Sequence, residues 1–93
     1  MSDKKFFGMR SELAWFANEM ERKLQLNDYK TGWKHMPLRQ LLTRLKQETR
    51  ELEKAIKNGK SVVEEAADVA NFAMMIANNF YDGQIETSAR NQK

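Results

Sequence analysis

Two pairs of acidic residues are the part of this chain whose types and spacing could do chemistry. Glu48 and Glu51 lie three residues apart, and Glu65 and Asp68 repeat that spacing after 13 intervening residues. An α-helix turns about 100° per residue, so the members of each pair would share a helix face. Carboxylate oxygens suit Mg²⁺ or Mn²⁺, and the pairs therefore predict a divalent-metal site if two helices bring them together.

Both pairs fall at apolar helix faces, where carboxylates are unusual. Glu48 occupies the position that should continue the leucine stripe between Leu45 and Leu52, and Glu65 and Asp68 border a second apolar stripe. Burial of an unpaired carboxylate is costly, so a converging cluster requires a bound cation or shifted pKa values. The alternative is that these acids are solvated and paired with bases within one helical turn, namely Arg44, Lys46, Arg50 and Lys54.

Three helical segments must position these residues. Apolar residues at helical spacing predict a first helix over residues 6–26, and the segment 27–35 breaks the pattern as a loop. Pro37 and Gly59 bracket a second helix, residues 37–58, because proline suits a first turn and glycine a left-handed stop.

Ser61 and Glu64 match a capping box that starts a third helix. We expect that helix to end near Tyr81, because Asp82 and Gly83 follow it. The chain would then comprise one helical domain, residues 1–82, and a polar C-terminal tail, residues 83–93.

The link between the second and third helices is short enough to force an antiparallel hairpin. Glu51 and Asp68 are then at about the same height, and all four carboxylates should converge.

The third helix is apolar nearly all round, and two other helices can hardly surround it. We therefore expect self-association into a homodimer or homotetramer with a four-helix-bundle core. Trp15 lies off the apolar face of the first helix, and is either part of the same contact or an ordinary exposed residue.

Composition supports an all-α fold and excludes several classes. The chain of 93 residues has room for one domain. Its 4 Gly and 1 Pro are few of the residues that form the turns between strands. Zero Cys excludes disulfides, zinc thiolates and a thiol nucleophile. No apolar run approaches a membrane span and the start lacks a signal peptide, so we expect a cytoplasmic protein without a membrane partner. A net charge of +3 without a groove-reading motif does not favour nucleic acid.

Further candidate residues surround the acidic pairs. Asn71, one turn beyond Asp68, is either a ligand contact or a packing residue, and Trp33 either stacks on a base or caps the core. Cations that could meet phosphate, or simply solubilise the surface, are Lys30, Lys34, Arg44 and Lys54. The only histidine, His35, is far from the acids in sequence, which disfavours a di-iron site of the Glu-x-x-His type. His35 is then a surface residue, a contact to the base of a substrate or a proton donor.

The acidic pattern, within EEAADVANFAMMIANN and preceded by NDYKTGWKHMPL, resembles the E-x-x-E and E-x-x-D signature of MazG-like proteins, the all-α NTP pyrophosphatase superfamily. The resemblance spans roughly residues 16–79 and implies that Glu48, Glu51, Glu65 and Asp68 bind Mg²⁺ in a helical oligomer. It also implies hydrolysis of a nucleoside triphosphate to the monophosphate and pyrophosphate, as in house-cleaning enzymes of the nucleotide pool. With one motif per chain, a shared site would need a second subunit.

Two hypotheses result. The first is a Mg²⁺-dependent nucleoside triphosphate pyrophosphohydrolase, with Mn²⁺ as a substitute ion and the four acids as catalytic and metal-binding residues. Its substrate-binding candidates are Trp33, Lys34, His35, Asn71, Lys54 and Lys30. The alternative is a non-catalytic helical oligomerisation or interaction module whose acids form salt bridges between helices.

Overall fold

The computed structural model describes residues 8–27 and 32–91, with side chains described as far as residue 83. These residues form α1 (Ser11–Leu26), the 3₁₀ turn η2 (Trp33–His35), α2 (Leu38–Asn58) and α3 (Val62–Asn91). No strand occurs within the described ranges. The all-α prediction with three main helices is confirmed.

The bounds of α2 follow from two local signals. Pro37 is extended (ψ 148°) and immediately precedes the helix, and Gly59 closes it in the left-handed conformation with φ 71°. The backbone N–H groups of Gly59 and Lys60 both donate to the carbonyl of Ala55, at 2.8 and 3.2 Å. These bonds satisfy a carbonyl that the helix end leaves free, so the predicted segment 37–58 is confirmed to within one residue.

The two other helices differ from expectation at one end each. α1 begins at Ser11, because Gly8 has φ 94° and Arg10 is extended, so its predicted start is wrong for residues 8–10; Phe6 and Phe7 lie outside the described residues. α3 begins at the predicted residue, but Ser61 has φ 64° and not the extended backbone of a capping-box residue.

The predicted end of α3 near Tyr81 is also wrong, because the helix continues through Gly83 to Asn91. A glycine inside a helix costs only about 1 kcal/mol relative to alanine, whereas no proline is present to break the hydrogen-bond ladder. The Asp82 carboxylate accepts a hydrogen bond from the Asn78 amide one turn earlier (3.2 Å), which supports the helix at that point.

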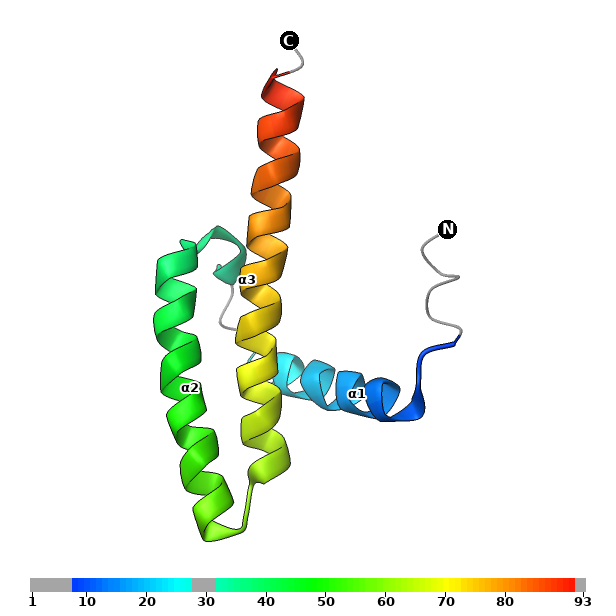
Figure 1. Cartoon of the computed structure of the whole chain (residues 1–93), viewed down its shortest axis with the longest axis vertical. Coiled ribbons are helices and arrows are strands. Elements are labelled where there is room, and N and C mark those ends of the chain that lie inside the picture. The colour runs from blue at the N-terminus through cyan, green and yellow to red at the C-terminus, as the bar shows by residue number, and fades with distance from the viewer. Residues whose placement is uncertain (1–7, 28–31, 92–93) are drawn as a thin grey trace.

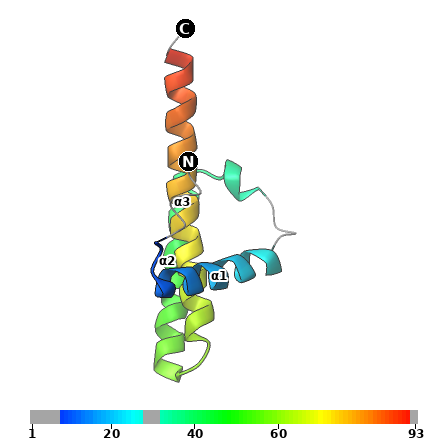
Figure 2. The ribbon, with the colours of Figure 1, turned by 90° about the vertical axis from the view of Figure 1, so that its right-hand side faces the viewer.

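α2 and α3 lie side by side, and the chain reverses direction between them at residues 59–61 (Figure 1). α1 crosses α3 steeply, with only its C-terminal end against α3, and η2 lies beside α3 further along (Figures 1 and 2). The C-terminal part of α3 projects beyond α2. α3 therefore contacts every other element.

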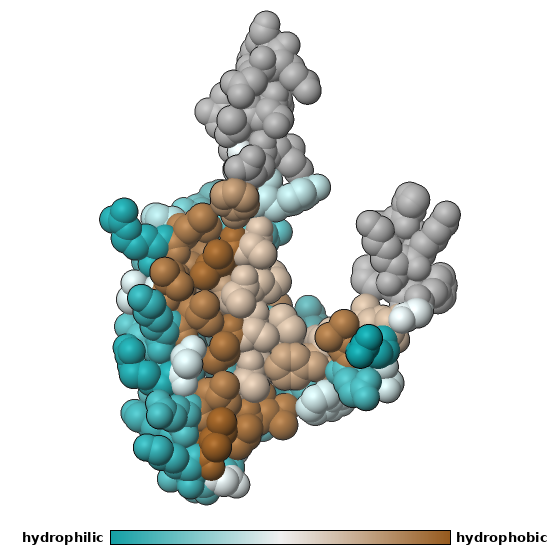
Figure 3. Space-filling view, in the orientation of Figure 1, coloured by the Kyte–Doolittle hydropathy of each residue, from teal (hydrophilic) through white to brown (hydrophobic). Residues whose placement is uncertain are grey.

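The hydrophobic core within the described residues is small. Four apolar side chains are buried, two on α2 (Leu41 and Ala55) and two on α3 (Ala67 and Met75). Other apolar residues form a band over the faces of α2 and α3 that Figure 3 displays. None of the described helices is both long and apolar enough to cross a membrane.

Candidate metal and phosphate site

Three of the four predicted acids come together where α2 and α3 face each other. Glu48, Glu65 and Asp68 each offer one carboxylate oxygen, and these oxygens lie within 4.8 Å of one another. All three side chains are half-buried. Since ligand oxygens of one divalent cation are this close to each other, the group has the composition and the spacing to hold a metal ion.

The helical register explains why these acids meet. Glu48 is seven residues from each of the buried α2 residues Leu41 and Ala55, and therefore points to α3 as they do. On α3, Asp68 follows the buried Ala67, and Glu65 lies one turn earlier on nearly the same face.

Glu51 is not in this group of three. Its side chain is 52 % exposed and lies 3.5 Å from the ammonium of Lys54, one turn further along α2. A three-residue step turns about 60°, and on α2 it turns Glu51 away from the side on which Leu45 and Leu52 lie, so Glu51 points towards solvent. Glu51 and Asp68 were expected at the same height along the hairpin, but equal height does not fix the rotation of Glu51 about the axis of α2.

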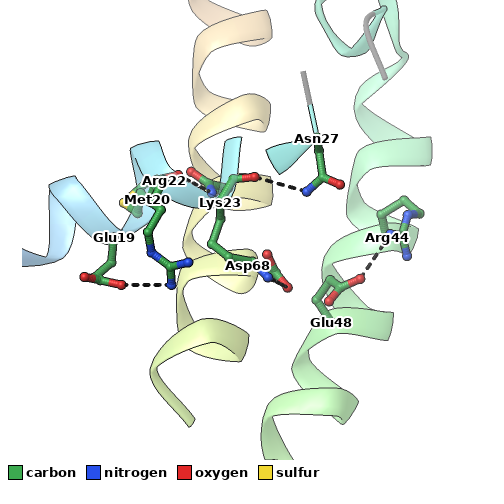
Figure 4. A network of polar contacts seen from close by, with 9 residues as sticks. Glu19, Met20, Arg22, Lys23, Asn27, Arg44, Glu48 and Asp68 are labelled. Carbon is green, nitrogen blue, oxygen red and sulfur yellow. Dashed lines mark hydrogen bonds and ion pairs between the residues drawn. The ribbon is translucent and has the colours of Figure 1, made fainter. Parts of the chain in front are cut away.

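Two cations pair with two of the three acids, Asp68 and Glu48 (Figure 4). Lys23 of α1 is 3.5 Å from Asp68, and Arg44 of α2 donates to Glu48 at 3.0 Å. The Arg44 guanidinium also lies 4.9 Å from the ring centroid of Phe72, which holds it against α3. The alternative expectation, that the acids are solvated and paired with nearby bases, is therefore met for Glu51, whereas Glu48 is paired but only 15 % exposed.

Glu65 combines burial with charge crowding. Burial raises the pKa of its carboxyl, and the neighbouring charges of Asp68 and Glu48 raise it further, against a lowering by Lys23. The shift is the one expected of a carboxylate beside two others, and it would be reversed by a divalent cation in the group.

A pocket of about 890 Å³ opens beside the acids, between α1, η2, α2 and α3. Glu48 and Asp68 form part of its wall, together with four of the predicted substrate-binding residues, Trp33, Lys34, His35 and Asn71. Lys54 is 68 % exposed and is not in the wall, and Lys30 lies outside the described residues. The Lys34 ammonium is 5.7 Å from the centre of the Trp33 ring, so an aromatic face and a cation are adjacent at one side of the pocket.

Two asparagine side chains on α3 attach the other walls of the pocket. Asn71 is 4 % exposed and donates to the Met20 carbonyl of α1 at 3.1 Å. Asn79 donates to the Trp33 carbonyl at 2.8 Å and to the Met36 carbonyl at 3.3 Å. Within the part of the chain that the structure describes, the buried Asn71 Oδ1 has no hydrogen-bond partner, so it is an unfilled acceptor on a residue of the pocket wall.

Sequence reasoning missed Lys23 and Asn79. Lys23 reaches Asp68 only because α1 crosses α3 at Met20, a contact between distant parts of the chain that periodicity does not encode. Asn79 gave a weak signal, since it lies eight residues after Asn71 and thus within about 80° of it around the helix.

Comparison of the chain with protein-family models, with curated proteins and with solved structures gives no match in any of the three.

Proposed function

We propose that this protein hydrolyses nucleoside triphosphates, either ribo- or deoxyribonucleotides, to the monophosphate and pyrophosphate in a Mg²⁺-dependent reaction. The observation that carries the proposal is the group of three half-buried carboxylates, of which Glu48 and Asp68 form part of the wall of a pocket that Lys23, Lys34 and Arg44 also line. Adjacent anionic and cationic groups suit a polyphosphate bound with its divalent ion. The resemblance of the acidic pairs to the MazG-like signature points to the same reaction, with a role in limiting unwanted nucleotides.

Glu48, Glu65 and Asp68 would hold the Mg²⁺, with Mn²⁺ as a substitute. The fit rests on the donor set, because three hard oxygen ligands lie close together and the raised pKa of Glu65 marks charge that a cation would offset. A bound divalent ion would neutralise charge on the triphosphate and lower the pKa of an attacking water.

The protein's own side chains would orient the substrate. Lys23 and Arg44 flank the acids and are placed to turn from the carboxylates to phosphate oxygens when the ion is bound. Trp33 offers a ring face for a base, and the unpartnered Oδ1 of Asn71 offers an acceptor.

Water would attack the α-phosphorus while the bond to the bridging oxygen breaks, so that pyrophosphate leaves and a carboxylate takes the proton of the water. A glutamate of the group orients or deprotonates this water. No side chain needs to form a covalent intermediate, in agreement with the absence of cysteine.

The proposal also includes the arrangement of the helices and of the chains that the sequence predicts. α2 and α3 act as an antiparallel hairpin, and two or four chains combine their hairpins into a four-helix-bundle core. Glu51, the fourth acid of the signature, lies at the edge of the site, and we propose that its charge contributes less than those of the other three.

The decisive experiment is phosphorus NMR of the purified protein with a panel of ribo- and deoxyribonucleoside triphosphates, with and without Mg²⁺. We expect monophosphate and pyrophosphate only when the metal is present. Asp68→Asn should reduce the rate at least about 100-fold, because loss of a ligand should exceed the 10- to 100-fold typical of groups that merely support one. Glu53→Gln, at an exposed α2 position, is the matched control.

Intact triphosphates across the panel, with the protein shown to be folded by circular dichroism, would refute the activity. Full activity in folded Asp68→Asn would refute the metal assignment.

A specific observation also favours the alternative, a non-catalytic interaction module. The acids already have internal partners, since Lys23, Arg44 and Lys54 each lie within 3.5 Å of one of them. In that case Mg²⁺ would leave the melting temperature unchanged, whereas a ligand of the native state raises it.

A further inference from the structure

The turn η2 is too short to fix its own position in the pocket wall. It has three residues, and the hydrogen-bond geometry of a 3₁₀ turn is poorer than that of an α-helix. Its two internal bonds run from the His35 N–H to the Gly32 carbonyl and from the Met36 N–H to the Trp33 carbonyl, both at 3.0 Å. Contacts outside the turn must therefore decide where its side chains lie.

The chain on either side of η2 does not supply those contacts. Gly32, which precedes the turn, has φ 103°, a left-handed conformation that glycine adopts without strain. Met36, which follows the turn, is extended with ψ 138° and leads into Pro37. Among the described residues, no backbone hydrogen bond joins η2 to α1 or α2.

Two hydrogen bonds from α3 attach the turn. The side-chain nitrogen of Asn79 has two hydrogens, and it donates to the Trp33 carbonyl at 2.8 Å and to the Met36 carbonyl at 3.3 Å. These bonds hold the first residue of η2 and the residue after its last. The turn packs mainly against α3, beside which it lies in Figure 1. Asn79 is half-buried, so both bonds are partly shielded from competing water.

Asn79 influences the pocket only through η2. It is not part of the pocket wall, whereas all three residues of η2 and Met36 are. The turn contributes the ring of Trp33, with the Lys34 ammonium 5.7 Å from the ring centre. The position of this aromatic wall thus depends on a side chain that does not itself line the pocket.

The same face of α3 carries an acid of the candidate metal group. Asn79 follows Asp68 by 11 residues, which is about 20° around the helix and about 16 Å along its axis. The buried Met75, also in the pocket wall, lies on this face between them. One continuous helix therefore sets the spacing between the metal end of the pocket and the turn that carries Trp33.

We infer that Asn79 is a positioning residue, which holds η2 where Trp33 receives the base of the nucleotide at a fixed distance from the metal. The inference rests on the proposed hydrolysis and specifies how that site recognises a base. The groups proposed to hold the ion and the phosphates, such as Asp68 and Arg44, belong to α2 and α3. Loss of the Asn79 bonds should therefore weaken base recognition and leave the reacting end of the site unchanged.

The test compares the kinetics of the full chain and of Asn79→Leu, which is similar in size but has no donor, on nucleoside triphosphates with Mg²⁺. We expect the KM to rise about tenfold and kcat to change less than about twofold, because a base contact present in both ground and transition states affects binding alone. Differences in KM among the bases should shrink, and the Mg²⁺ concentration for half-maximal activity should stay the same.

Three further variants support this comparison. Asn79→Gln keeps an amide donor and should recover part of the loss. Asn18→Leu makes the same change at an exposed position of α1 and is the matched control. Asn79→Ala, which removes the donor without adding apolar bulk, takes the place of Asn79→Leu if that variant does not fold.

A second measurement reports on η2 without catalysis. The chain has two tryptophans, so in a Trp15→Phe background the fluorescence comes from Trp33 alone. We expect acrylamide to quench this fluorescence more strongly when Asn79→Leu is added, because the released turn is more accessible to the quencher.

Each contrary outcome has a distinct meaning. Unchanged acrylamide quenching in folded Asn79→Leu would overturn the inference, because another contact would then hold η2. An unchanged KM in that variant would also overturn it, while hydrolysis by the unmodified chain would leave the proposed function intact. Equal losses of kcat and of Mg²⁺ activation would give Asn79 a general structural role instead. Lack of hydrolysis by the unmodified chain would refute the proposed function and, with it, the role of Asn79 in base recognition.

Discussion

The two sides of α3 use the same helix in opposite ways. The side that carries Asp68, Asn71 and Asn79 faces α1, η2 and α2, and each of these polar side chains has a partner inside the chain. The other side carries Ala73, Ala77 and Phe80, which are exposed in the single chain.

This difference shows which interactions the chain completes by itself. Buried polar groups of the pocket side are paired because an unpaired buried group is costly, and among the described residues the exception is the Asn71 Oδ1 at the proposed binding site. An exposed apolar atom carries no comparable cost, so the apolar side of α3 can remain uncovered in the single chain. We therefore expect substitutions on the two sides to affect different measurements.

Lys23→Met, at the pocket, should produce the largest difference between the measurements that report on the two sides of α3. Removal of a charge-assisted bond worth about 1.5–3 kcal/mol should raise the KM for a nucleoside triphosphate roughly ten- to hundredfold. The mass measured by sedimentation should stay unchanged. The Mg²⁺ concentration that gives half-maximal activity should not rise, since Asp68 no longer pairs with a cation that competes with Mg²⁺.

Arg22→Met is the control for Lys23→Met, since Arg22 is exposed and paired with Glu19 on the same helix. An unchanged KM in Lys23→Met would show that the pair with Asp68 persists during binding and that Lys23 does not contact phosphate.

Glu65→Gln should have a smaller effect, whose sign depends on pH. Because the folded-state pKa of Glu65 is raised above its ordinary value of 4.5, the folded chain holds this proton more tightly than the unfolded chain. The protonated Glu65 carboxyl therefore contributes fully to the stability of the folded chain below pH 4.5, and this contribution is lost as pH rises through the folded-state pKa. In metal-free protein, Glu65→Gln should melt a few degrees higher than the unmodified chain at pH 7, and the difference should disappear in acid.

Added Mg²⁺ should reverse this order by raising the melting temperature of the unmodified chain more than that of Glu65→Gln. Glu64→Gln, at an exposed position of the same turn, is the control. A variant that is less stable than the unmodified chain at pH 7 without metal would contradict the charge crowding described above.

Glu51→Gln should have the smallest effect, and it tests whether Glu51 belongs to the site. We expect kcat/KM to fall less than about tenfold, below the range for groups that directly support a metal ligand. A loss as large as that of Asp68→Asn would instead show that Glu51 joins the other acids when metal and substrate are bound, as the E-x-x-E signature implies.

The sequence predicted those features that depend on residues close together in the chain. Pro37 and Gly59 delimit α2 because each acts through its own backbone conformation. Glu48 was recognised because it interrupts a leucine stripe, and that stripe is itself a periodic signal. Gly83 misled the prediction, because a glycine marks a helix end only when the neighbouring residues also favour one.

The features that were missed depend on how the helices cross. Lys23 and Asn79 form contacts with residues more than 40 positions away, and no local pattern fixes the angle between α1 and α3. The position of Glu51 depends on the rotation of α2 about its own axis against α3, which the height of a residue along a hairpin does not determine.

The asparagine contacts of α3 have a consequence for the order of folding. Asn71 reaches Met20 across 51 positions, and Asn79 reaches Trp33 and Met36 across 46 and 43. Such long-range contacts form only after the intervening chain has paid its loop-closure entropy. During synthesis α1 and η2 are made first but cannot be docked until residues 71–79 follow. The pocket is therefore not formed until α3 is in place.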